Sequence, residues 1–155
     1  MSRVALDSNI LVYLAGLARV EEDRAKTTRV RQVIRTLEST VEIIAPVQTL
    51  GELYVVLRRN KVPPAKARNE VGDLAEAFGT APSVSSTLLA ALDLAADHRL
   101  QFWDSLILTA AQEANCTLLL SEDMQDGFAV GGLTVVNPLA SEPHPMLARL
   151  LRAEA

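Results

Sequence analysis

The sequence of 155 residues has few of the side chains that build thiolate or imidazole metal sites. A single cysteine, Cys116, excludes an internal disulfide framework and a zinc site made of thiolates alone. Two histidines, His98 and His144, leave little room for a histidine-based metal site. Any metal that this chain binds is therefore expected to have oxygen ligands.

Long hydrophobic runs are missing as well. No apolar run approaches the roughly 20 residues that a membrane-spanning helix needs. The apolar stretch 10–18 follows Arg3 as in a signal peptide, but it is short, and Asp7, Ser8 and Asn9 separate it from Arg3. We therefore expect a protein that makes no contact with membranes and acts in the reducing cytoplasm.

The composition is that of a folded protein, with 49% hydrophobic and 22% charged residues. A chain of 155 residues suffices for one compact domain and is short for two. No internal repeat or linker interrupts it. We expect one domain over residues 1–140, and a helical tail over 141–155 that packs on this domain or extends from it.

Short apolar runs alternate with longer amphipathic segments along the chain. The short runs predict strands at 4–6, 41–45, 83–86, 117–120 and 133–136. The longer segments predict helices at 10–14, 21–39, 47–60, 64–78, 87–98, 102–115 and from about 145. On the helix at 47–60 the apolar side is expected to carry Leu50, Leu53, Tyr54 and Leu57. The alternation predicts an α/β fold, a three-layer α/β/α sandwich around a mainly parallel sheet.

Two of the predicted strands end in carboxylates. Asp7 follows the strand at 4–6, and Asp123 follows the strand at 117–120. Asp104 lies in the first turn of the preceding helix, and Glu52 is the only acidic residue of the helix at 47–60. Ligands of open parallel sheets gather beyond the carboxyl ends of the strands, so we expect these side chains to converge there.

Four ionised carboxylates in one crevice repel one another, which raises their pKa values or drives them apart. A divalent cation such as Mg²⁺ or Mn²⁺ removes this conflict, because both ions prefer oxygen ligands. Such an ion can activate water and hold phosphate oxygens during an in-line displacement. The acidic set therefore predicts hydrolysis of phosphodiester bonds.

Each carboxylate also has a purely structural explanation. Asp7 could cap the helix that follows, and Asp104 could be favoured by the dipole of its own helix. Asp123 could be a turn residue, and Glu52 a solvated helix charge. Their occurrence together, in this order, favours the functional interpretation.

Four segments resemble the acidic motifs of PIN-domain ribonucleases. Residues 6–13 (LDSNILVY) resemble the opening motif, 49–53 (TLGEL) the helix with the glutamate, and 103–107 (WDSLI) the third motif. Residues 118–127 (LLLSEDMQDG) resemble the fourth motif in the form found among VapC-type toxins of bacterial toxin–antitoxin pairs. The resemblance extends from about Arg3 to Pro138, and four motifs in order are specific where one alone is weak.

This resemblance implies an endoribonuclease that depends on Mg²⁺ or Mn²⁺, is inhibited by a small antitoxin protein and is commonly a homodimer. By position, the metal site consists of Asp7, Glu52, Asp104 and Asp123. Asn9 and Ser121 match positions where polar side chains support the carboxylates. Asp126 is the reserve candidate for the fourth acidic residue.

RNA and the antitoxin would need further surfaces. Between Arg24 and Arg68 the sequence has ten basic and three acidic residues, although the whole chain has a net charge of −4. Within this segment, the residues that could meet RNA phosphates are Arg58, Arg59, Lys61, Lys66 and Arg68, unless they are ordinary helix-surface charges. Aromatic residues make up only 4%, so base stacking is not expected to dominate recognition. Apolar residues at 24–37 and 66–78 could form a groove for the antitoxin or belong to the core.

Two other functions fit parts of the pattern. A catalytically inactive PIN-like module could bind RNA or protein, although such a module is expected to lack part of the acidic set. A haloacid-dehalogenase-like phosphatase also has an aspartate after its first strand. That family needs a second aspartate at the position of Asn9 and a lysine beyond Lys66, and this sequence has neither.

Overall fold

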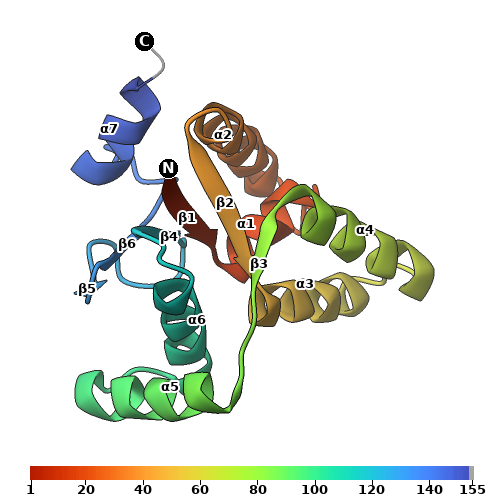
Figure 1. Ribbon diagram of the computed structural model, residues 1–155. Helices are drawn as coiled ribbons and strands as arrows, with labels where there is room; N and C mark the ends of the chain where they lie inside the picture. The colour runs from red at the N-terminus through yellow and green to blue at the C-terminus, as the bar shows by residue number, and fades with distance from the viewer. Residues whose placement is uncertain (154–155) are drawn as a thin grey trace.

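The computed structural model describes residues 1–153 (Figure 1). The strands are β1 (Ser2–Leu6), β2 (Val41–Pro46), β3 (Gly79–Ala81), β4 (Leu118–Leu120), β5 (Ala129–Val130) and β6 (Leu133–Val136). The helices are α1 (Ser8–Leu14), α2 (Glu22–Leu37), α3 (Val47–Arg59), α4 (Pro64–Ala77), α5 (Ser85–His98), α6 (Phe102–Glu113) and α7 (Pro145–Arg152). The alternation of short strands and longer helices is confirmed.

The six-stranded sheet has the order β3-β2-β1-β4-β6-β5. Its pairings are parallel except that β5 runs antiparallel to β6. The central strand β1 pairs with β2 on one side and β4 on the other, with Val4 opposite both Ile43 and Leu118. The connections that follow β1 and β4 therefore leave the same edge of the sheet at its topological switch point.

Side chains that alternate along the strands divide the core into two halves. Val4 and Leu6 of β1 pack in a cluster with α1, α2, α3, α4 and α7, whereas Ala5 packs in a second cluster with α5 and α6. Figure 1 shows α2, α3 and α4 on one side of the sheet and α5 and α6 on the other. The predicted three-layer α/β/α sandwich with a mainly parallel sheet is confirmed.

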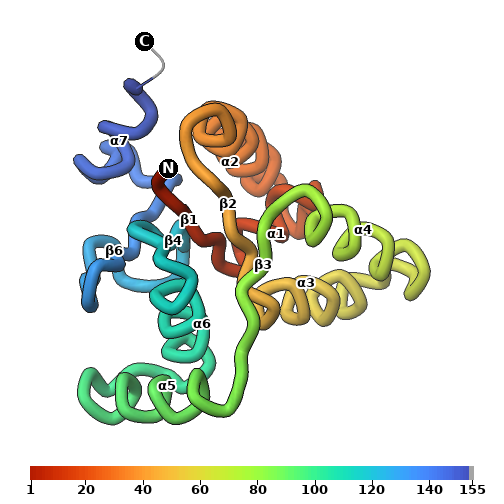
Figure 2. The backbone as a smooth tube through the Cα atoms, in the orientation of Figure 1, coloured from red at the N-terminus to blue at the C-terminus, as the bar shows by residue number. Residues whose placement is uncertain are grey.

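The strand predicted at 83–86 is wrong. The third strand is β3 at Gly79–Ala81, which pairs with the end of β2. Beyond it the chain crosses to the opposite side of the sheet and enters α5 at Ser85 (Figure 2). The serines begin a helix because the Thr87 hydroxyl accepts a hydrogen bond from the Val84 N–H at 3.1 Å.

A second correction concerns Tyr54, which was assigned to the apolar side of its helix. Its side chain is 37% exposed, whereas Leu50, Leu53 and Leu57 are buried. Positions three and four residues apart share the face of α3 that packs on α1, and Tyr54 lies at the margin of this face. β5 is a two-residue strand that the sequence pattern did not indicate.

The apolar residues of α2 and α4 belong to the core. Val33 and Leu37 of α2 and Ala67 of α4 are buried, and Val71 and Leu74 pack against them. These side chains therefore do not line an open groove for an antitoxin. The helix predicted from about residue 145 is α7, and its Leu147 is buried in the same cluster. Among residues 1–153, no helix combines the length and hydrophobicity needed to cross a bilayer.

Candidate active site

Asp7 occupies the turn between β1 and α1 and is only 4% exposed. One of its carboxylate oxygens, Oδ1, accepts a hydrogen bond from the Ser8 N–H at 2.7 Å, so Asp7 does cap the helix as the structural explanation proposed. The other oxygen, Oδ2, accepts from the Ser121 hydroxyl at 2.7 Å and from the Asn9 amide at 3.3 Å. The carboxylate is thereby fixed in one orientation at the switch point of the sheet.

Asn9 and Ser121 join the end of β1 to the loop that follows β4. The Asn9 Nδ2 atom also lies 3.3 Å from Asp123 Oδ2, and its Oδ1 accepts from the Glu122 N–H at 3.1 Å. The buried Ser121 hydroxyl accepts in turn from the Met124 N–H at 3.1 Å. The two polar side chains therefore contact the acidic residues that they were expected to support.

The ambiguity between Asp123 and Asp126 is reduced by these contacts. Asp123 shares the Asn9 amide with Asp7, whereas Asp126 Oδ1 accepts from the backbone N–H of Asn137 at 2.8 Å. Asp126 therefore fastens the loop after β4 to the residue that follows β6. Asp123, in contrast, lies on the side of the other acidic residues.

Burial and mutual repulsion act together on the carboxylates. Burial raises the pKa of Asp7 to about 6; the hydrogen bonds from Ser121 and Ser8 oppose this rise, and the charges of Asp104 and Glu52 add to it. Burial also raises the pKa of Asp104, with further contributions from Glu52 and Asp123. Asp7, Glu52 and Asp104 thus interact electrostatically with one another, and Asp123 interacts with Asp104.

The four carboxylates do not form a ready coordination cluster. No three acidic, histidine or cysteine side chains within residues 1–153 stand close enough together to hold one ion. Glu52, half-buried on α3, is turned toward Gln48, whose amide donates to it at 3.0 Å. The donor set fits a hard divalent cation in its chemistry, because every donor is a carboxylate oxygen and the repulsion among them is relieved by positive charge.

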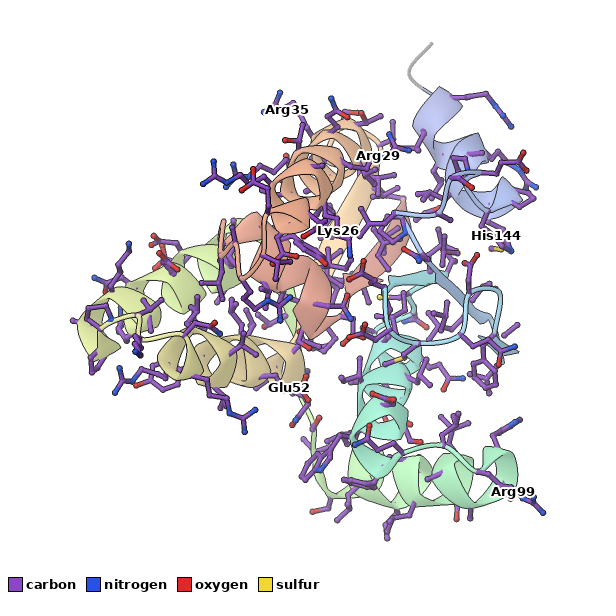
Figure 3. All side chains as sticks on the ribbon, turned by 180° about the vertical axis from the view of Figure 1, so that it is seen from behind. Lys26, Arg29, Arg35, Glu52, Arg99 and His144 are labelled. Atoms are coloured by element: carbon purple, nitrogen blue, oxygen red, sulfur yellow. The ribbon has the colours of Figure 1, made fainter. Side chains whose placement is uncertain are left out.

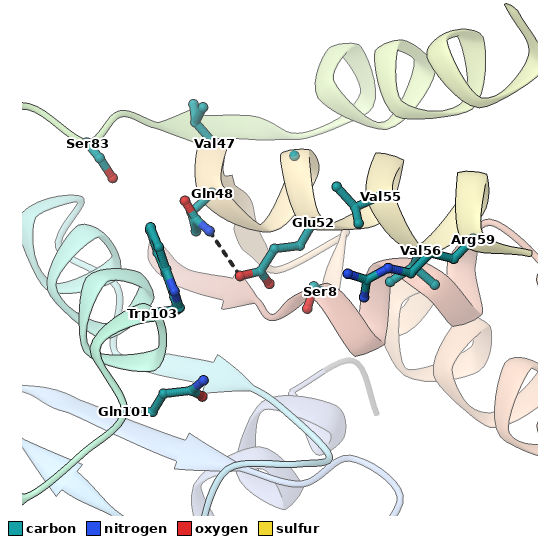
Figure 4. Close-up of a pocket in the computed structure, with 11 residues that line it drawn as sticks. Ser8, Val47, Gln48, Glu52, Val55, Val56, Arg59, Ser83, Gln101 and Trp103 are labelled. Carbon is teal, nitrogen blue, oxygen red and sulfur yellow. Dashed lines mark hydrogen bonds between the residues drawn. The ribbon is translucent and has the colours of Figure 1, made fainter. Parts of the chain in front are cut away.

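An open cleft of about 1000 Å³ adjoins this acidic edge between α3 and the start of α6 (Figure 4). Its lining includes Glu52, Gln48 and Arg59 from α3, Ser8 from α1, and Gln101 and Trp103 at the start of α6. Of the four predicted carboxylates, Glu52 lines this cleft, whereas Asp7, Asp104 and Asp123 do not. Ser8 and Trp103 in the lining are the sequence neighbours of Asp7 and Asp104, so the cleft lies next to the acidic residues.

The model of the PIN domain family matches residues 4–129. The chain belongs to the PIN domain family. The match covers all four acidic motifs and ends before β6, so α7 lies outside it. No curated protein matches the sequence.

Solved structures of toxins share the fold of this PIN domain. VapC20 of Mycobacterium tuberculosis, described as a toxin that cleaves the sarcin–ricin loop, is 13% identical with a TM-score of 0.61 over 77% of this chain and 89% of that one. VapBC2 of Rickettsia felis, bound to a promoter DNA fragment, is 14% identical with a TM-score of 0.63 over 87% and 98%. DNA-bound VapBC of Salmonella typhimurium is 12% identical with a TM-score of 0.66 over 89% and 99%.

The basic residues proposed to bind RNA are not all placed alike in this PIN domain. Arg59 lines the cleft, whereas Arg58, Lys61 and Arg68 lie outside its lining. Arg58 donates to the carbonyl of Val62 at 2.9 Å and so closes its own helix end. The remaining residue, Lys66, is 3.9 Å from Glu70 on the same helix.

Sequence reasoning missed a polar network behind the loop that carries Asp123. The Tyr13 hydroxyl donates to Glu122 Oε1 at 2.6 Å, and Lys26 Nζ lies 2.9 Å from Glu122 Oε2. Burial raises the pKa of Tyr13 to about 12, and Glu122 adds to the rise. Lys26 lies on α2 (Figure 3), and in the sequence it is far from Glu122, so no local sequence signal could have linked the two. Trp103 and Gln48 of the cleft were also missed.

Proposed function

We propose that this PIN domain is a metal-dependent endoribonuclease that hydrolyses RNA phosphodiester bonds. The observation that carries the proposal is Asp7, a carboxylate buried at the sheet's switch point with its pKa raised to about 6, beside Asp104 and Glu52. A protein gains no stability from such an arrangement, since burial and repulsion both disfavour the charged form. Strongly perturbed carboxylates beside a cleft are typical of functional sites.

Asp7, Asp104 and Asp123 would hold Mg²⁺ or Mn²⁺, with Glu52 as a further ligand or as the group that orients the attacking water. When bound, the cation would lower the pKa of a water molecule and stabilise negative charge on the phosphate. Ser121 and Asn9 hold Asp7 in place by hydrogen bonds at 2.7 and 3.3 Å. Asn9 also keeps the Asp123 loop against the end of β1.

The remaining cleft residues would position the RNA. Among the predicted RNA-binding residues, Arg59 lines the cleft. Its guanidinium would pair there with a phosphate oxygen next to the cleaved bond. Arg58, Lys61 and Arg68 would add sequence-independent attraction from farther away. We propose as substrate a single-stranded or looped RNA segment whose backbone would reach the carboxylates through the open cleft.

We infer further that the protein is the toxin of a toxin–antitoxin pair. The fold shared with VapC20 and the VapBC complexes supports this inference, as does the form of the 118–127 motif. The proposal includes an antitoxin protein as partner, a homodimer as the assembled state and the cytoplasm as the site of action. It also assigns nuclease activity to residues 1–140 and treats 141–155 as a tail.

The proposal is tested by incubating the purified full chain with single-stranded RNA in Mg²⁺, Mn²⁺ or EDTA. We expect cleavage with either ion, none in EDTA and none by Asp104→Asn. Asp126→Asn is the matched control and is expected to cleave as the unmodified protein does, because its side chain holds the Asn137 backbone instead. Failure of the unmodified protein to cleave RNA, with no difference from Asp104→Asn, would leave the inactive binding module as the better account.

The structure adds an argument against the phosphatase alternative. Asn9, at the position where a haloacid-dehalogenase-like enzyme needs a second aspartate, uses its amide to bridge Asp7 and Asp123. Turnover of a small phosphomonoester, which the same preparation can be tested for, is therefore not expected.

A further inference from the structure

Trp103 is the only tryptophan of the chain, and its side chain is 52% exposed. It lies in the first turn of α6, directly before Asp104, while the next residues, Ser105, Leu106 and Ile107, are buried. The buried part of α6 therefore begins at Ser105, and the indole of Trp103 remains outside the core. Its only ring contact among the described residues is an edge-on contact with Phe102, whose centroid is 5.0 Å away.

The exposed indole borders the cleft of the acidic site. Figure 4 shows it on the α6 side of the cleft, with Gln48 and Glu52 between it and Arg59. An aromatic surface thus stands on one side of Glu52 and a guanidinium on the other. These are the two groups with which proteins hold an unpaired nucleotide, one for the base and one for the phosphate.

We propose that Trp103 is the stacking surface for an RNA base next to the cleaved phosphate. This inference rests on the proposed function and adds a residue that binds substrate. Since every base has an aromatic face, stacking on Trp103 would hold the strand with little dependence on sequence. It adds one stacking contact to a chain whose low aromatic content predicts that base stacking does not dominate recognition.

The cleft lining is mixed, and its polar groups favour a nucleotide over a purely apolar protein segment. Val47, Val55 and Val56 line it together with Gln48, Gln101 and Ser83, whose amides and hydroxyl lie on the side of the indole, and Arg59 adds a positive charge farther along. Such groups can bond the polar edges of a base and its phosphate, and they would be left unpaired under an apolar side chain. The exposed apolar residues of α5, including Leu88, Leu89 and Leu92, do not line this cleft.

The single tryptophan allows a direct binding test. The full chain is titrated in EDTA, so that no RNA is cut, with a pool of 10-nucleotide single-stranded RNAs of mixed sequence. A ribose-phosphate strand of equal length without bases is the control ligand. We expect the RNA pool to quench the Trp103 fluorescence and the strand without bases to leave it unchanged. Equal signals with both ligands, or no quenching at saturating RNA, would overturn the proposal.

Variants test the role in turnover. Trp103→Leu is expected to raise the KM for RNA by about tenfold or more, because stacking on one aromatic side chain contributes that much to binding, while kcat changes less. Trp103→Phe keeps an aromatic face and is expected to retain most of the affinity. Tyr54→Leu, at an exposed aromatic residue outside the cleft lining, is the matched control and is expected to leave KM unchanged.

The two proposals fail in distinguishable ways. If the protein cuts RNA and Trp103→Leu has an unchanged KM, the stacking proposal is wrong while the nuclease stands, and the indole is left for a protein partner. If the protein cuts no RNA but the RNA pool still quenches Trp103 and the strand without bases does not, the nuclease proposal fails and base stacking stands.

Discussion

Asp7 and Glu52, two carboxylates of the same acidic site, are held in opposite ways. Asp7 is 4% exposed and accepts hydrogen bonds from Ser8, Ser121 and Asn9. Glu52 is half-buried on the wall of the open cleft and, among residues 1–153, accepts one hydrogen bond, from Gln48 one helical turn away. One half of the site is built into the sheet, whereas the other can move with a side chain.

The difference indicates how the proposed metal site would be assembled from two kinds of ligand. The fixed half is held by backbone and buried hydroxyl groups, so Asp7 cannot turn away from its neighbours. Glu52 is held through Gln48, so a rotation of its side chain would be enough to turn it toward a cation shared with Asp7 and Asp104. This accounts for carboxylates that perturb one another's pKa values without enclosing an ion.

The largest difference between Asp7 and Glu52 is expected in the rate of RNA cleavage after each carboxylate is replaced by its amide. Asp7→Asn is expected to lower the rate of RNA cleavage by about a thousandfold or more, since a fixed metal ligand contributes several kcal/mol to catalysis. Glu52→Gln is expected to lower it by about ten- to a hundredfold, because its position is not fixed. Initial rates in saturating Mg²⁺ measure both. Equal losses would show that the two halves are equivalent in the active protein.

Loss of the group that holds Asp7 should weaken metal binding more than loss of the group that holds Glu52. Ser121→Ala removes a buried donor at 2.7 Å from Asp7 and is expected to weaken Mn²⁺ binding by about ten- to a hundredfold. Gln48→Ala removes the partner of Glu52 and is expected to change Mn²⁺ affinity by no more than a few fold. Calorimetric titration with Mn²⁺ compares the two variants. A larger effect from Gln48→Ala would reverse the comparison.

Asp7 should also make stability depend on pH in the absence of metal. Its pKa is about 6 in the folded chain against an ordinary 3.8, so the folded state binds the proton more tightly than the unfolded state. The free energy of unfolding therefore falls as pH rises through this interval, by roughly 1–3 kcal/mol. Asp7→Asn removes the titrating group and is expected to be more stable than the unmodified protein at pH 7.5 in EDTA, with a Tm several degrees higher.

Thermal unfolding at pH 4 and at pH 7.5 measures this effect. The stability advantage of Asp7→Asn should shrink at pH 4, where the carboxyl group of the unmodified protein is protonated in the folded chain. The same advantage at both pH values would mean that the ionised carboxylate is not the destabilising group.

The smallest effect is expected in the network behind the Asp123 loop. Tyr13→Phe removes the hydrogen bond to Glu122 and should cost about 1–2 kcal/mol of stability, because the acceptor is charged but only half-buried. Lys26 still pairs with Glu122 at 2.9 Å, so the loop should keep its path and cleavage should fall by only a few fold. Urea denaturation and initial rates check both parts. A loss of activity as large as that of Asp7→Asn would place Tyr13 in the catalytic machinery.

The sequence predicted the parts of this structure that local patterns determine. The strand before Asp7 and the strand before Ser121 are short apolar runs, and parallel pairing then brings their ends together. β3 was missed because three residues at the sheet edge carry no periodicity, and the helix cap by Thr87 is a contact that only geometry reveals. The phase of α3 was predicted correctly, but its buried face is narrower than expected, which leaves Tyr54 at the margin.

The site was less predictable than the fold. The motif positions indicated Asp7, Glu52, Asp104 and Asp123, but not that Glu52 turns to Gln48. Arg58 and Arg59 are adjacent in sequence, yet only Arg59 lines the cleft, because neighbours on a helix point in different directions. The hydrogen bond from Tyr13 to Glu122 joins residues that are 109 positions apart in the sequence, so only the tertiary fold brings them together.

Calorimetric titration of the full chain with Mn²⁺ tests the central claim most directly. The account predicts that the unmodified protein and Asp126→Asn bind the ion with equal affinity, whereas Asp7→Asn and Asp104→Asn lose most of the binding. Unchanged Mn²⁺ affinity in both Asp7→Asn and Asp104→Asn would contradict the claim that these carboxylates share a metal ion.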